Sequence, residues 1–141
     1  MSARAELSAR GSHRLRSAGV VAFAFFANAI VTTITDQIFH ILDVYPPWGQ
    51  PMHEPALNAL ALSYRIVFAV LAGYLVARLA PAAPMRHVLV LGTLGLVAAS
   101  IAAFVTITRY DLGPAWYPIA IAVTALPAVW LGGQLHARRA R

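Results

Sequence analysis

Long apolar stretches alternate with short polar breaks along the chain. The apolar stretches cover approximately residues 17–39, 55–80, 85–108 and 115–135. Each is close to the roughly 20 residues that a helix needs to cross a bilayer. None shows the alternation of polar and apolar positions that is typical of a membrane β-strand. The pattern therefore predicts an all-α membrane protein with four transmembrane helices.

The breaks between the apolar stretches carry turn-forming residues. Residues 43–54 are rich in proline, and residues 81–84 begin and end with proline. Pro55 suits the first turn of the second helix, where its missing N–H is not needed. Residues 1–16 are polar and rich in Arg. We therefore expect a cytoplasmic tail over residues 1–16 and a single membrane domain over residues 17–141.

The composition supports a membrane protein and excludes a soluble globular protein and a disordered chain. Hydrophobic residues make up 60% of the 141 residues and charged residues 11%, with a mean hydropathy of +0.68. Soluble domains have about 45–50% apolar and about 25% charged residues, and disordered chains are still more polar. The chain has no Cys, which excludes disulfides and thiolate chemistry. No nucleotide-binding or hydrolase motif is present, so we expect neither an enzyme nor a cofactor.

The distribution of positive charge predicts the orientation in the membrane. All eleven basic residues are Arg, and the formal net charge is +6. Nine of them lie in the two tails or beside the break at residues 81–84: Arg4, Arg10, Arg14, Arg16, Arg78, Arg86, Arg138, Arg139 and Arg141. Positive charge stays on the cytoplasmic side of a membrane. Both termini are therefore expected in the cytoplasm.

Acidic and aromatic residues gather toward the opposite boundary. The acids there are Asp36, Asp43, Glu54 and Asp111, and the aromatic residues are Tyr45, Trp48, Tyr110, Trp116 and Tyr117. Trp and Tyr typically form belts at a membrane surface. We therefore interpret this side as the outer boundary and its Tyr and Trp residues as a belt.

The same charge pattern indicates where the protein resides and what it contacts. A composition rich in Arg and free of Lys is typical of GC-rich bacterial genomes, so we expect the bacterial inner membrane. Because the Arg residues lie at membrane edges, we expect no nucleic acid partner. The expected partners are the lipid bilayer and either a second copy of the chain or another membrane protein.

A secretory signal peptide is an alternative interpretation of the first stretch. Residues 27–29 read Ala-Asn-Ala, which resembles a cleavage site. Cleavage there would leave three spans and move the new N-terminus outside. The apolar run continues past this site to Ile34, which favours an uncleaved first span.

The chain also contains an internal similarity. Residues 71–80 and 131–140 are identical at six of ten aligned positions. The pattern Asp-x-x-Pro-x-Trp occurs at residues 43–48 and again at residues 111–116. Two tandem hairpin repeats forming a four-helix bundle would explain both matches and would give the halves the same orientation. Shared composition is the alternative explanation.

A polar stripe runs along the first predicted helix. Its members, spaced four residues apart, are Asn28, Thr32, Asp36 and His40. Residues at this spacing share one helix face, and lipid disfavours such a face. We therefore expect the stripe to face the interior of the bundle.

The second predicted helix carries an arginine within the membrane. Arg65 lies ten residues after Pro55, a depth of about 15 Å at 1.5 Å per residue. An Arg at this depth stays charged and requires a partner or water. We predict an Asp36–Arg65 ion pair. Further candidates for the same network are Tyr64, Asn58 and His40.

Three functional hypotheses follow from these residues. The first is a structural or accessory protein in which the Asp36–Arg65 pair holds helices together. The second is a subunit that transports a small solute, an ion or a proton, using Asp36, His40 and Arg65. The third is a membrane metal protein or enzyme with a site at the outer face. The metal candidates are the His and acidic residues His40, His53, Glu54 and Asp43, although no recognised ligand motif is present.

Several segments resemble known bacterial membrane proteins. The segments are Tyr45–Met52, Ser63–Arg65, Gly73–Pro81 and Pro84–His87. They resemble a loose set of small four-span inner-membrane proteins that have no assigned activity, so the resemblance implies a location and no chemistry. The four-span size is also similar to that of small multidrug transporters. Those transporters rely on an acid in the middle of the first span, whereas Asp36 lies nearer its outer end.

Overall fold

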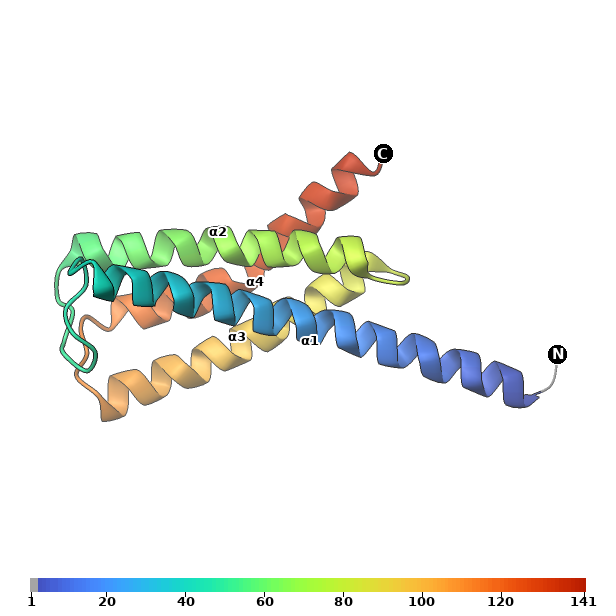
Figure 1. Ribbon diagram of the computed structural model, residues 1–141, viewed down its shortest axis with the longest axis horizontal. Coiled ribbons are helices and arrows are strands. Elements are labelled where there is room, and N and C mark those ends of the chain that lie inside the picture. Colours follow the sequence, from blue (N-terminus) through green and yellow to red (C-terminus); the bar gives the residue numbers. More distant parts are fainter. Residues whose placement is uncertain (1–2) are drawn as a thin grey trace.

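Four long helices make up the protein. The computed structural model describes residues 3–141, with side chains from residue 10 onward. The helices are α1 (Ala3–Ile41), α2 (Pro55–Leu79), α3 (Pro84–Arg109) and α4 (Trp116–Arg139), and the described residues form no strand. Each helix is long and apolar enough to cross a membrane. The predicted all-α, four-helix membrane bundle is confirmed (Figure 1).

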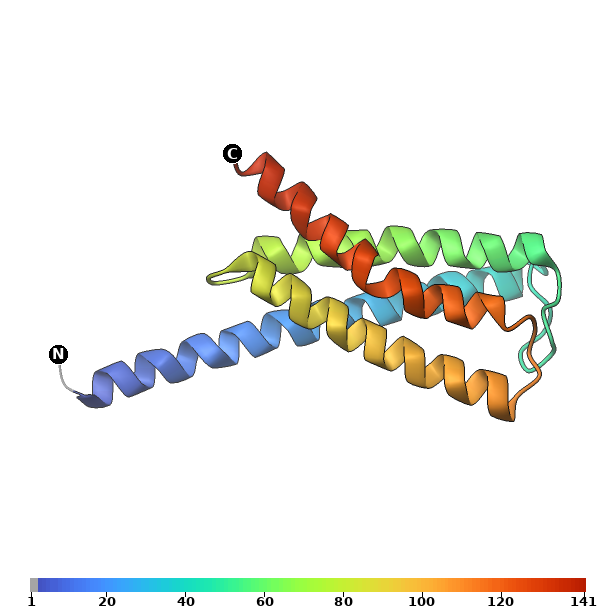
Figure 2. The same cartoon turned by 180° about the vertical axis from the view of Figure 1, so that it is seen from behind.

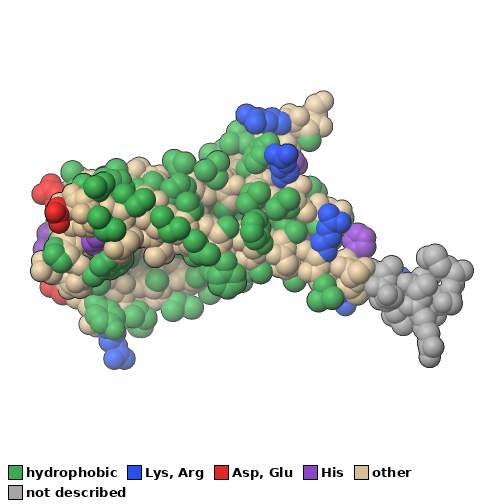
Figure 3. All heavy atoms as spheres, in the orientation of Figure 1, with side chains coloured by type: hydrophobic (Ala, Val, Ile, Leu, Met, Phe, Trp, Pro, Cys, Tyr) green, Lys and Arg blue, Asp and Glu red, His purple; other side chains and the backbone are tan. Residues whose placement is uncertain are grey.

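The bundle has two chemically different ends. The loops at residues 42–54 and 110–115 meet at one end, called here the loop end, where the Met52 N–H donates to the Leu112 carbonyl at 2.8 Å. Both chain termini and the turn at residues 80–83 lie at the other end, called the terminal end (Figure 1). In Figure 3, blue Arg side chains cluster at the terminal end, and the red acidic side chains lie at the loop end.

The tightest helix contact joins α2 to α4. A Cβ placed on Gly73 would lie 1.9 Å from the Val129 carbonyl oxygen, and one on Gly132 would lie 1.9 Å from the Val70 carbonyl oxygen. Only glycine fits at such distances, because the two backbones touch. Small residues commonly allow this approach between membrane helices. The two helices run side by side in the same direction in Figures 1 and 2.

The C-terminal half of α4 turns away from the rest of the bundle. Pro127 lies inside this helix. Proline lacks the N–H that would bond to the carbonyl of Val123, and its ring crowds that carbonyl. Figure 2 shows the resulting bend and the C-terminal part projecting past α2.

Helix α1 is much longer than its predicted span. Its 39 residues correspond to a length of about 58 Å, roughly twice the hydrocarbon core of a bilayer. The helix continues through the stretch expected to be a polar tail, because Ala, Arg, Leu and Glu are good helix formers. Figure 1 shows its N-terminal part extending beyond the bundle.

Helix α1 is also weakly buried. Its buried side chains are Val21 and Ala24, with 7% and 0% exposure, and both lie in the central part of the helix. Toward the loop end Ile30, Ile34 and Ile38 are exposed, as lipid-facing residues are. Helices α1 and α3 lie close near the terminal end and diverge toward the loop end in both ribbon views.

Candidate functional site

An ion pair joins α1 to α2 in the loop-end half of the bundle. Asp36 lies five residues before the end of α1, and Arg65 lies near the middle of α2. The Arg65 Nη2 atom is 2.6 Å from the Asp36 Oδ2 atom, and the side chains are 22% and 16% exposed. The structure therefore brings together the two charged residues of the predicted pair.

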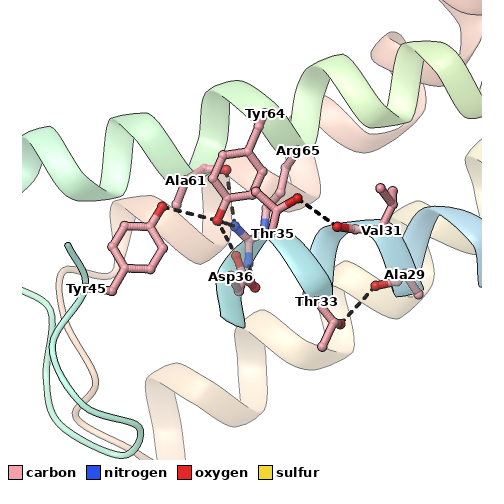
Figure 4. Close-up of polar contacts among 9 residues, drawn as sticks. All are labelled: Ala29, Val31, Thr33, Thr35, Asp36, Tyr45, Ala61, Tyr64 and Arg65. Atoms are coloured by element: carbon pink, nitrogen blue, oxygen red, sulfur yellow. Dashed lines mark hydrogen bonds and ion pairs between the residues drawn. The ribbon is translucent and has the colours of Figure 1, made fainter. Parts of the chain in front are cut away.

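Two tyrosine hydroxyls complete the hydrogen bonding of this pair. Tyr64 donates to the Asp36 Oδ1 atom, so each carboxylate oxygen accepts one bond. Arg65 Nη1 donates to the Tyr64 hydroxyl oxygen at 3.0 Å and to the Ala61 carbonyl at 3.2 Å. Tyr45 donates to the Tyr64 hydroxyl oxygen at 3.1 Å. Figure 4 shows the group between the two helices.

Aromatic rings surround the guanidinium group. The Arg65 Cζ atom lies 5.2 Å from the centre of the Tyr64 ring and 5.9 Å from that of Tyr117. Contacts of this kind attract a cation, and more strongly where water is scarce. Tyr45 reaches the group from the loop and is only 5% exposed. Burial raises the pKa of its hydroxyl, which keeps that group protonated and able to donate.

His40 and Asn58, the other predicted members of the network, bond to the loop at residues 42–54 instead. His40 Nδ1 donates to the Pro46 carbonyl at 2.7 Å, and the His40 ring packs on Trp48 at 4.1 Å between centres. Asn58 Nδ2 donates to the carbonyls of Met52 and Glu54 at 2.9 and 3.0 Å. Both side chains therefore fix residues 42–54 onto the helix ends rather than bonding to Asp36 or Arg65.

The deeper members of the polar stripe stay apart from the ion pair. Asn28 and Thr32 are half-buried, and neither hydrogen-bonds to the pair within the described structure. The Asn28 Oδ1 atom is buried and has no hydrogen-bond partner among the described residues. Of the four stripe residues, Asp36 is therefore the one that bonds to Arg65.

The metal candidates do not form a binding cluster. Asp43, His53 and Glu54 are exposed, and the Nδ1 atom of His40 already bonds to a carbonyl. Across the part of the chain that the structure describes, no three His, Asp or Glu side chains come close enough together to hold a metal ion.

A cavity of about 580 Å³ opens beside the ion pair at the loop end. Its walls come from all four helices and both loops, and they include Asp36, Tyr45, Arg65, Ala99, Ala102, Thr106, Tyr117 and Ile121. The divergence of α1 and α3 creates this space. Figure 3 shows the face hollowed between α1 and the loop-end half of α3.

Sequence reasoning missed the roles of Tyr45 and Tyr117. Both were interpreted as belt residues, whereas Tyr45 is buried and Tyr117 is half-buried against Arg65. Trp48, Tyr110 and Trp116 are exposed as belt residues are. The sequence signal is that a charged Arg65 within the membrane needs hydroxyl groups and aromatic faces, which tyrosines near the same boundary can supply.

Comparison with known proteins identifies no relative. No family model matches the chain, and neither a curated protein nor a solved structure matches it. The geometry of the site therefore carries the functional argument. That geometry offers a charge-neutral, hydrogen-bonded group that joins two helices, with one side facing a cavity.

Proposed function

We propose that the protein is a structural or accessory component of the bacterial inner membrane in which the Asp36–Arg65 pair clamps α1 onto α2. The observation that carries this proposal is that both charged groups find hydrogen-bond partners within the protein. Both Asp36 oxygens accept hydrogen bonds, and Arg65 bonds to Asp36, Tyr64 and the Ala61 carbonyl. A group that is satisfied from within the protein can hold helices together without a ligand.

The weak burial of α1 supports a need for such a clamp. Lipid chains are as apolar as Leu, so apolar surface gives little drive for helices to associate inside a membrane. Helix α1 has few buried side chains, whereas α2 and α4 make direct backbone contact. The ion pair and the Tyr64 hydrogen bond therefore contribute a large part of what holds the loop-end half of α1 in place.

A double-mutant cycle tests the clamp. Asp36→Asn and Arg65→Met each leave one partner unmatched, and the unfolding free energy in detergent should fall by about 3–5 kcal/mol for each. The double variant should lose clearly less than the sum, because the two residues interact directly. Arg109→Met, at an exposed position in the last turn of α3, is the control and should change stability little. Additive losses from the two single variants would contradict the clamp.

The two halves of the chain are proposed to descend from one hairpin. The α2 and α4 helices run in the same direction, as tandem hairpins require. They meet at Gly73 and Gly132, which lie close to matching positions when residues 71–80 are aligned with 131–140. Arg65 and Asp36 have no charged counterparts in the second half, so the site belongs to the first half alone.

A second candidate function is passage of a small solute, an ion or a proton. The cavity beside Arg65 favours it, because a purely structural pair needs no space next to it. Asp36 and Arg65 would then contact the solute, and His40 would hold the loop at the entrance. Four helices enclose little volume, so a second copy of the chain is part of this candidate.

Cysteine accessibility decides whether the cavity holds water. Ala102 lines the cavity, whereas Ile101 lies at the same depth of α3 and faces outward at 61% exposure. In the Cys-free chain, Ala102→Cys should react with a charged thiosulfonate about tenfold or more faster than Ile101→Cys. The reason is that only the thiolate reacts, and a lipid environment suppresses formation of the thiolate. Equal, slow reaction of both would remove the support for the second candidate.

A further inference from the structure

A second groove lies between α1 and α3 at the terminal end, far from the ion pair. It has a volume of about 410 Å³. Its lining residues are Ser17, Ala18, Val21 and Ala22 on α1 and Arg86, His87, Val90 and Leu94 on α3. The groove is thus lined almost entirely by apolar surface, and Arg86 and His87 mark its mouth at the end of α3.

The apolar body of the groove runs along α1 and α3. From Arg86 to Leu94 the α3 helix rises about 12 Å, which takes the groove from the helix end into the hydrocarbon region. Ala18 and Ala22 leave space on the α1 side that larger residues would fill. An extended hydrocarbon chain fits a narrow apolar trough of this kind.

The mouth of the groove carries positive charge from both helices. Arg86 is exposed in the first turn of α3, and no ion pair or hydrogen bond of its side chain is present among the described residues. Arg14 precedes Ala18 by one helical turn, so it lies on the same face of α1 as the groove. His87 adds a further polar group, with Nδ1 3.3 Å from the Ala83 carbonyl.

No acidic side chain among the described residues lies near these arginines. The acids whose side chains are described, Asp36, Asp43, Glu54 and Asp111, all lie in the loop-end half (Figure 3). The neighbouring groups at the terminal end are the exposed Arg10, Arg16, Arg78, Arg138 and Arg139. Among the described side chains, this mouth therefore has positive charge and no acidic counterpart.

We propose that this groove binds one anionic phospholipid, with its phosphate between Arg14 and Arg86 and one acyl chain between α1 and α3. A lipid supplies both the apolar chain for the trough and the negative charge for the mouth. Basic pockets between membrane helices commonly hold anionic lipid headgroups. The bound chain would fill the groove between α1 and α3. This proposal is independent of the role of Asp36.

Native mass spectrometry of the delipidated protein tests the proposal. The wild-type chain should retain one phosphatidylglycerol with an affinity about tenfold or more above that for phosphatidylcholine with the same acyl chains. Arg86→Gln should weaken phosphatidylglycerol binding about fivefold, since each arginine near a lipid surface contributes about 1 kcal/mol. Arg109→Gln removes the same charge from the other end of α3 and should leave binding unchanged. Ala22→Phe, which fills the trough, should weaken both lipids.

Three results would overturn the lipid site. One is equal affinity of the wild-type chain for the two lipids, which requires no variant to be made. Another is an equal loss in Arg86→Gln and Arg109→Gln, which would indicate diffuse attraction to the charged surface. The last is thermal stabilisation by inorganic phosphate equal to that by phosphatidylglycerol, which would indicate a site for a free anion.

Discussion

At the scale of single residues, Tyr64 connects the parts of the polar site. A tyrosine hydroxyl can donate one hydrogen bond and accept two. Tyr64 uses all three, because it donates to Asp36 and accepts from Tyr45 and Arg65. This one oxygen therefore links α1, α2 and the loop at residues 42–54.

Tyr64→Phe should destabilise the protein while preserving the ring. The variant leaves the Tyr45 hydroxyl and one Asp36 oxygen without their partner, and an unsatisfied buried group costs about 1–3 kcal/mol. Thermal unfolding in detergent measures the loss. Tyr110→Phe is the matched control, because Tyr110 is 58% exposed, and it should change stability by less than about 0.5 kcal/mol. Equal stability of the two variants would show that the Tyr64 hydroxyl contributes nothing.

At the scale of helices, two kinds of contact hold the bundle together. One is direct backbone contact, and the other is the polar group around the Asp36–Arg65 pair. Helices α2 and α4 touch through Gly73 and Gly132, and Gly92 packs on Leu126 to bring α3 against α4. These three helices form the well-packed part of the bundle. Helix α1 joins it through a few small apolar residues and the Asp36–Arg65 group, which makes α1 the helix most sensitive to loss of a single interaction.

Alanine substitutions at glycines should separate these two kinds of packing. Gly73→Ala and Gly132→Ala each place a Cβ 1.9 Å from a backbone oxygen, so the helices must move apart at a cost of about 1–3 kcal/mol. Gly95→Ala meets its nearest atom at an ordinary 4.0 Å and should gain up to about 1 kcal/mol from higher helix propensity. Unfolding in detergent compares the three. A stabilised Gly132→Ala would mean that the helices are not in contact there.

At the scale of the whole molecule, the two ends differ in charge. Exposed arginines surround the terminal end, whereas the described acids and the exposed Trp48, Tyr110 and Trp116 lie toward the loop end. The positive-inside tendency then supports termini in the cytoplasm and loops outside. The ion-pair cavity would open outward, and the lipid groove would face the inner leaflet.

Single cysteines test this orientation directly, because the chain has none of its own. Gln50 in the loop and Ala82 in the turn are both exposed. In intact cells an impermeant maleimide should label Gln50→Cys and leave Ala82→Cys unlabelled until the membrane is permeabilised. The reverse labelling pattern would place the termini outside. It would also move the proposed lipid groove to the outer leaflet.

The length and spacing of apolar runs were enough to predict the helices. The second and third helices begin and end within a residue of the predicted stretches, and prolines mark where they begin, at Pro55 and Pro84. The first helix extends beyond the predicted apolar stretch at residues 17–39. A hydropathy pattern marks where a helix is apolar, whereas polar helix formers such as those before Ser17 continue a helix into water.

By itself, the sequence determined the four-helix membrane fold and indicated that Arg65 needs a partner, because a charge in lipid is so costly that its compensation is obligatory. Only the tertiary structure decided which other groups complete that site. Tyr45 and Tyr117 join it, while His40 and Asn58 bond to the loop. The cavity is likewise tertiary, since it depends on the angle at which α1 and α3 diverge. Which helices pack together follows from contacts such as Gly73 with Val129. These contacts join positions far apart in the chain and leave no periodic signal within any one segment.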